Sequence, residues 1–135
     1  MFYKIMEIDG IAAEYVRRLA KAGVTTTEHL LAKTGDAKAR EQLAVQTGIG
    51  ARPLAKWTGL ADLMRVKGIG RQYGELLQAV GVNSTEKLTS FTPGELIRMM
   101  NEHKKAKKQS GGVPKLAAIE QWLNELRAPE FAPAK

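Results

Sequence analysis

Apolar residues recur along this 135-residue chain at intervals of three and four positions, the spacing that places them on one face of an α-helix. Two such series are Ile11, Tyr15, Leu19 and Ala22, and Ile69, Tyr73, Leu77 and Val80. Each series ends at a Gly-Val pair, and glycine readily adopts the left-handed conformation that terminates a helix. No stretch shows the alternation and β-branched enrichment of strands flanked by turns. The pattern therefore predicts an all-α protein.

Capping residues mark where the following helices begin. Two capping boxes are predicted after the Gly-Val pairs: Thr25 with Glu28 and, in a looser form, Asn83 with Glu86. Asp36 is expected to cap a helix that runs to Gln46. The simplest role of Gly48-Ile49-Gly50 is to end that helix and to start another, which carries Leu54 and Trp57.

The C-terminal part of the chain has equally clear signals. Thr92-Pro93-Gly94-Glu95 combines a cap, a proline at the first helical position and a glutamate three residues after the cap, which predicts a helix to about Lys108. A loop over residues 109–112 follows, and Pro114 restarts a helix that Pro129 ends. We expect residues 129–135 to form a frayed tail.

The sequence also repeats itself at a shift of 58 positions, which places residues 8–30 over residues 66–88. The matched positions are glycine, aromatic or apolar: Gly10 with Gly68, Ile11 with Ile69, Tyr15 with Tyr73, Leu19 with Leu77, Gly23-Val24 with Gly81-Val82, and Leu30 with Leu88. Such recurrence indicates one supersecondary unit used twice. We expect a first repeat with connecting helices in residues 1–60 and a second repeat with additional C-terminal helices in residues 61–128, packed as one compact unit.

The turn that opens the second unit has two glycines around one apolar residue. The stretch Leu63-Met64-Arg65-Val66-Lys67-Gly68-Ile69-Gly70 resembles the helix-hairpin-helix motif of proteins that bind DNA without sequence specificity. The resemblance implies that Gly68 and Gly70 form the turn and that Ile69 fills the core. Bare backbone amides and the N-terminus of the next helix would then approach a phosphate. The resemblance also implies phosphate-facing charge on Arg65, Lys67 and Arg71.

The first unit departs from this pattern. Ala12 replaces the second glycine, and Val16 fills the position where Gly74 stands in the second unit. Asp9 and Glu14 place negative charge beside the turn, where it would repel phosphate. We therefore expect the first hairpin to serve packing rather than binding.

A run of four lysines lies at the predicted C-terminus of a helix. Cations there complement the helix dipole, which accounts for one or two of them but less well for four. The chain has a formal net charge of +7 and a sequence pI near 9.8, so its surface attracts nucleic acid or an acidic protein. The four lysines of the run are therefore further candidates for contact with nucleic acid: Lys104, Lys105, Lys107 and Lys108.

The composition argues against other classes of function. Without cysteine and with only His29 and His103, neither a disulfide nor a metal site is expected. The histidines follow glutamates, but neighbours in a helix point about 100° apart, so no catalytic pair and no cofactor site is indicated. No apolar run approaches the roughly 20 residues of a membrane span, and no secretory signal is present. We expect a cytoplasmic protein that is not an enzyme.

Taken whole, the order of elements resembles an uncharacterised bacterial family, a domain of unknown function with tandem helix-hairpin-helix repeats. The stretches that carry this resemblance are 8–26 and 61–82, and the run Ala61-Asp62-Leu63-Met64-Arg65 is the more distinctive part. The resemblance implies a fold and no activity.

Two functional hypotheses follow from the sequence. The first is binding to the phosphate backbone of DNA or RNA, without sequence specificity, through the second hairpin and the lysine run. The alternative is a protein-protein interaction adaptor in which the hairpins are purely structural and an exposed helical face docks a partner. The degenerate first hairpin favours this alternative.

Overall fold

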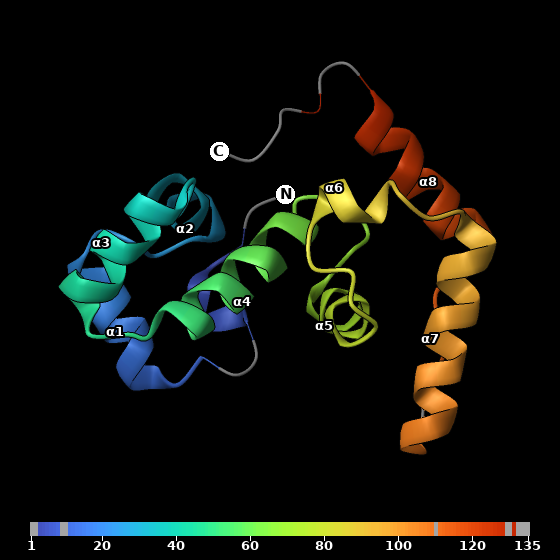
Figure 1. Cartoon of the computed structure of the whole chain (residues 1–135), viewed down its shortest axis with the longest axis horizontal. Helices are drawn as coiled ribbons and strands as arrows, with labels where there is room; N and C mark the ends of the chain where they lie inside the picture. The colour runs from blue at the N-terminus through green and yellow to red at the C-terminus, as the bar shows by residue number, and fades with distance from the viewer. Residues whose placement is uncertain (1–2, 9–10, 110, 129–130, 132–135) are drawn as a thin grey trace.

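A computed structural model describes residues 3–8, 11–109, 111–128 and 131, and within them the chain is helical, with one isolated bridge between Lys4 and Thr26 and no strand. The elements are η1 (Ile5–Glu7), α1 (Ala13–Lys21), α2 (Thr27–Lys33), α3 (Ala37–Thr47), α4 (Ala51–Leu63), α5 (Arg71–Ala79), α6 (Thr85–Leu88), α7 (Pro93–Lys107) and α8 (Leu116–Arg127) (Figure 1). The prediction of an all-α protein is confirmed.

The helices form two groups, each around its own hydrophobic cluster. The first cluster draws on η1 and α1–α4, and the second on the end of α4 and on α5–α8. Figure 1 shows the first group on the left, the second on the right and α4 running between them. Met64 belongs to the first cluster and Leu63 to the second, so the C-terminal end of α4 joins the two groups. The boundary predicted after residue 60 falls within α4.

The two groups share a packing plan. Helices α1 and α5 have nine residues each and begin 58 positions apart, as the sequence shift requires. In the first group, the ring of Tyr15 lies 5.8 Å from that of Trp57; in the second, the ring of Tyr73 lies 5.7 Å from that of Trp122. Both tryptophans are buried, which confirms that they are core residues. In each group, therefore, a tyrosine of the first α-helix packs against a tryptophan of the last.

Several predicted helix ends are confirmed. The side chain of Asp36 accepts a hydrogen bond from the Ala39 amide at 2.7 Å and caps α3. Thr92 and Glu95 form the predicted capping box of α7. Gly48 ends α3 in the left-handed conformation, and Gly50 precedes α4.

Other boundaries differ from the prediction by one or two residues. The caps of α2 and α6 are Thr26 and Ser84, so the predicted caps at Thr25 and Asn83 are each wrong by one position. Three consecutive threonines leave the position of the cap ambiguous in sequence, and the ring of His29 accepts from the Thr25 amide where a glutamate was expected. Helix α8 begins two residues after Pro114.

Part of the predicted C-terminal tail, together with Pro129, lies outside the described residues. Phe131 is described, and it packs against the second cluster.

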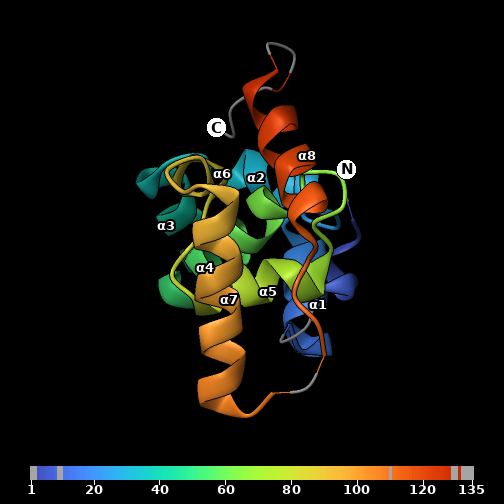
Figure 2. The same ribbon diagram turned by 90° about the vertical axis from the view of Figure 1, so that its right-hand side faces the viewer.

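The clearest difference between the groups is the length of their third helix. Helix α3 has 11 residues and α7 has 15, an addition of about one turn. The last turn of α7 carries the lysine run, and Lys108 follows it in the left-handed conformation at φ +53°. This end of α7 extends beyond the neighbouring helices, and the chain then returns towards α8 (Figure 2). The added turn is thus where the basic residues gather.

Candidate nucleic-acid interface

The turn before α5 has the geometry that its glycines require. Gly68 has φ +95°, a conformation that L residues rarely adopt, and Gly70 caps α5 without a side chain. Ile69 between them is fully buried in the second cluster. A Cβ on Gly68 would lie 3.0 Å from the indole nitrogen of Trp122. The turn is therefore pressed closely against α8.

A carboxylate already occupies one amide of this turn. The backbone N–H of Lys67 donates to the Glu125 side chain of α8 at 2.8 Å. A phosphate at that amide would have to displace Glu125 and would meet its negative charge. The turn therefore presents less open backbone than the motif suggests, although the side chains of Lys67 and Arg71 are exposed.

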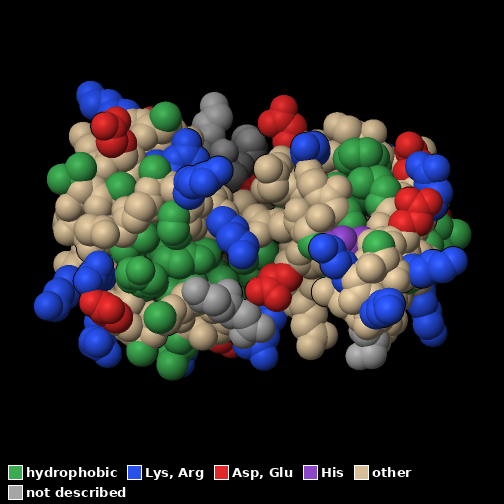
Figure 3. All heavy atoms as spheres, turned by 60° about the horizontal axis from the view of Figure 1, so that its bottom comes forward, with side chains coloured by type: hydrophobic (Ala, Val, Ile, Leu, Met, Phe, Trp, Pro, Cys, Tyr) green, Lys and Arg blue, Asp and Glu red, His purple; other side chains and the backbone are tan. Residues whose placement is uncertain are grey.

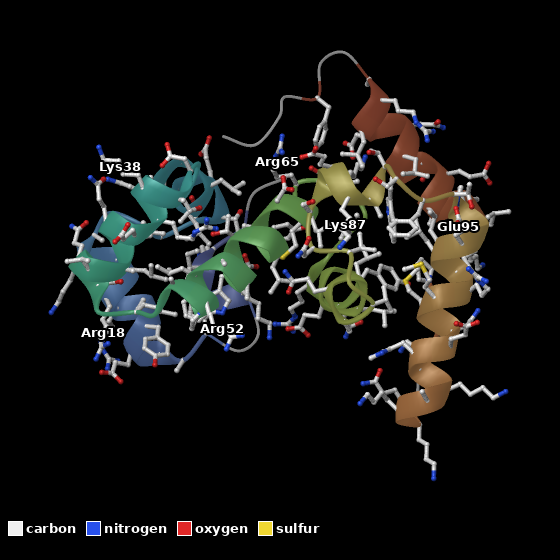
Figure 4. All side chains as sticks on the ribbon, in the orientation of Figure 1. Arg18, Lys38, Arg52, Arg65, Lys87 and Glu95 are labelled. Carbon is white, nitrogen blue, oxygen red and sulfur yellow. The ribbon has the colours of Figure 1, made fainter. Side chains whose placement is uncertain are left out.

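Arg65 is held inside the structure. Its guanidinium donates to Asp62 at 2.9 Å, with both side chains only 11% exposed, and it lies 4.5 Å from the centre of the Phe131 ring (Figure 4). Asp62 in turn accepts from the backbone amide of Thr85 at 2.8 Å and from its hydroxyl at 3.0 Å. The distinctive Ala-Asp-Leu-Met-Arg run thus fastens α4 to the start of α6, and Arg65 offers little charge to a ligand.

Arg71 extends away from the turn towards the first group. Its guanidinium donates to the backbone oxygen of Glu7 at 3.4 Å. The residue after it, Gln72, begins the part of α5 that faces α7 across a cleft.

This cleft, of about 1340 Å³, lies between α5 and the C-terminal end of α7. Lys56 of α4 lines one side, and Lys104 and Lys108 line the other. The remaining polar lining consists mainly of side-chain amides, with one imidazole and one carboxylate: Gln72, Gln78, Asn83, Gln109, His103 and Glu75. On the face shown in Figure 3, lysine and arginine side chains are spread over both sides, and a histidine is visible on the right. Cations outnumber carboxylates in the lining.

The lysine run therefore divides into two pairs. Lys104 and Lys108 line the cleft, whereas Lys105 and Lys107 are exposed outside it. None of residues 65–71 lines the cleft, so the second hairpin and the lysine run do not form one continuous site. Helix α5 lies between them. Lys56 was missed by the sequence analysis because it lies alone between apolar positions of α4, 52 residues before Lys108.

The walls of the cleft are fixed by contacts between helices. The Gln78 amide nitrogen donates to the backbone oxygen of Lys56 at 2.9 Å and ties α5 to α4. The ring of Tyr73, which is half-buried in the lining, packs on Trp122. At the far end of α7, hydrogen bonds with the Thr92 backbone and side chain, aided by the charge of Arg98, lower the pKa of Glu95 below its usual value. Helix α7 thus carries negative charge at its start and positive charge at its end, in agreement with its dipole.

Helix α1 of the first group has an acidic residue in its first turn, whereas α5 has none. Glu14 forms an ion pair with Arg18, whose guanidinium lies 5.6 Å from the centre of the Tyr15 ring. Ala12 caps α1 without a side-chain hydrogen bond. Asp9 and Gly10, which the sequence analysis placed at this turn, lie outside the described residues.

Over residues 9–128 the sequence matches the family model described as Domain of unknown function (DUF4332), and the chain belongs to that family. No curated protein and no solved structure matches the chain. In the part of the chain that the structure describes, no helix is both long enough and apolar enough to cross a membrane.

Proposed function

We propose that this protein binds the phosphate backbone of nucleic acid without reading base sequence, through the cleft between α5 and the end of α7. The family to which this chain belongs has no assigned activity. One observation carries the proposal: Lys56 of α4 and Lys108, which directly follows α7, line the same open cleft although they are 52 residues apart in sequence. Lysine ammonium groups bind phosphate as point charges and release its counterions.

In this proposal the helix-hairpin-helix resemblance has a reduced role. Glu125 holds the amide of Lys67, and Asp62 holds Arg65, so the turn serves mainly to position α5 against α8. The exposed side chains of Lys67 and Arg71 supply secondary contacts outside the cleft. The principal charge comes from α4 and α7.

The test is the affinity for a labelled random-sequence DNA at several salt concentrations, measured by fluorescence anisotropy. Intact protein should bind with an affinity that falls log-linearly with salt. The double variant Lys56→Glu, Lys108→Glu should lose at least about tenfold in affinity, and its salt slope should fall by roughly 0.7–0.9 for each phosphate contact removed.

A matched control keeps this test specific. Lys33 and Lys38 are exposed on the first group, and Lys38 projects from α3 on the side of the molecule opposite α7 (Figure 4). The variant Lys33→Glu, Lys38→Glu makes the same change in net charge and should bind nearly as well as intact protein. Equal losses in both variants, or no salt-dependent binding by the intact protein, would overturn the proposal.

The protein-interaction adaptor remains a second candidate because Glu125 and Asp62 occupy the polar groups of the second hairpin. The occupied amide of Lys67 favours hairpins that are purely structural. Val45 on α3 is 81% exposed and gives an apolar contact to the helical face that would dock a partner. An adaptor for an acidic protein should bind polyglutamate at low salt. It should bind a nucleic acid with the same number of negative charges no more tightly than polyglutamate. Preferential binding of nucleic acid would exclude this candidate.

A further inference from the structure

We infer that the cleft accommodates a single-stranded segment of nucleic acid rather than a duplex. The inference rests on the proposed function and specifies the form of the ligand. A duplex exposes its base edges only in its grooves, and proteins read grooves with elements that protrude, such as a helix or a β-ribbon. The site here is hollow and open. A hollow accepts groups that protrude from the ligand, and unstacked bases of a single strand do so.

The polar groups that line the cleft are suited to unpaired bases. Gln72, Asn83 and Gln109 are exposed, and each carries an amide that both donates and accepts hydrogen bonds. Base edges also present donors and acceptors together, whereas phosphate presents acceptors alone. Amides can donate to phosphate oxygens, but only groups that also accept can pair with both kinds of base-edge group, so this lining suits bases as well as phosphates.

The charges divide the cleft into regions. Lys56 and Lys108 lie on its two sides, where successive phosphates of a strand would be neutralised. The carboxylate of Glu75 in the lining repels phosphate from the α5 side of the cleft. Phosphates are therefore expected beside the lysines, and bases over the wall formed by α5.

An aromatic ring lies in that wall. Tyr73 lines the cleft, and its ring is held by Trp122 at a centroid distance of 5.7 Å and an interplanar angle of 53°. Proteins that bind single strands combine a positively charged groove with aromatic side chains on which bases stack, and this stacking tolerates any base. Tyr73 is packed in place before a ligand arrives, which limits the entropy lost on binding.

The backbone at Lys108 is a separate observation that points the same way. The equivalent end of α3 is Gly48, which adopts the left-handed conformation without strain, whereas Lys108 adopts it at φ +53° against the preference of an L residue. Of the described residues other than glycine, Lys108 alone has positive φ. A glycine at this position would avoid the strain, and a contact between the Lys108 ammonium group and a phosphate in the cleft would offset it.

The experiment compares a labelled single strand with a hairpin duplex that has the same number of phosphates, at one salt concentration, by fluorescence anisotropy. Intact protein should bind the single strand about tenfold more tightly, as expected from stacking of one or two bases. A DNA and an RNA strand of the same sequence are both included, and tighter binding of either than of its duplex supports the inference.

Variants separate the bases from the phosphates. Gln72→Ala with Gln109→Ala should weaken binding of the single strand several-fold without changing the salt slope. The control Gln42→Ala with Gln46→Ala, at exposed positions of α3, should have no effect. If duplex binds as tightly as single strand, or if the cleft and control variants behave alike, the inference fails while the proposed function stands. If neither form binds at low salt, the proposed function fails as well.

Discussion

The two helical groups share a plan but are fastened differently, at a pair of equivalent threonines. In the first group, Thr27 is anchored by backbone: its amide donates to the Tyr3 oxygen at 2.8 Å, and its hydroxyl accepts from the Tyr3 amide at 3.0 Å. In the second group, Thr85 is anchored by the side chain of Asp62. A backbone anchor tolerates most substitutions, whereas a carboxylate anchor depends on one residue.

The groups differ in charge as well. Residues 1–63 contain nine lysines and arginines against seven acidic residues, and residues 64–135 contain twelve against seven. Most of the difference lies in the added turn of α7. The proposed binding surface therefore draws most of its charge from the second group, together with Lys56 of α4.

The largest expected effect is that of Asp62→Ala. The substitution leaves the partly buried guanidinium of Arg65 and the amide of Thr85 without their carboxylate, which should cost about 3 kcal/mol of unfolding free energy. Thr27→Ala should cost only about 1 kcal/mol from lost hydrogen bonding, because the backbone anchor remains. Urea denaturation of both variants measures the difference, and equal losses would contradict the distinction between the two anchors.

A smaller effect with two readouts is expected at the ends of α3 and α7. Lys108→Gly relieves the strained backbone and should raise the unfolding free energy by about 0.5–1 kcal/mol. The same variant should weaken binding of nucleic acid several-fold through loss of a phosphate contact. Thermal melting without ligand and anisotropy with ligand measure the two effects separately.

The reciprocal change is Gly48→Ala at the end of α3. It forces an L residue to φ +71° and should destabilise the protein by about 1 kcal/mol without affecting binding. If Lys108→Gly proves destabilising, the backbone at Lys108 is not strained; if the variant leaves the affinity unchanged, Lys108 makes no phosphate contact.

Much of the fold was predictable from the sequence because its determinants are local. The helical spacing of the apolar residues Ile11, Tyr15 and Leu19 predicts α1. The same spacing recurs 58 positions later and predicts α5. Caps with one plausible candidate, such as Asp36, were placed correctly. Where several residues can cap, as in Thr25-Thr26-Thr27, tertiary contacts of Thr27 decide, and the prediction was wrong by one position.

The candidate site was less predictable because its determinants are distant in sequence. Glu125 reaches the amide of Lys67 across 58 residues, and no local pattern marks it. Arg65 could be recognised as basic, but its pairing with Asp62 and its contact with Phe131 depend on how the chain folds. The lysine run was visible in the sequence, whereas the cleft that it borders required the positions of α4 and α5.

The smallest expected effect concerns the starts of α3 and α7, which are capped in different ways. Asp36 caps α3 alone, whereas α7 has a capping box in which Glu95 accepts from the Thr92 amide at 2.9 Å. Hydrogen bonding with Thr92 lowers the pKa of Glu95 from its usual 4.5, so the folded state favours the charged form. This stabilisation is present above pH 4.5 and is lost as the pH falls through the lowered pKa. Glu95→Gln should therefore lower the melting temperature slightly at neutral pH, and the two melting curves should converge in acid; a difference that stays constant with pH would show that the charge of Glu95 contributes nothing to the cap.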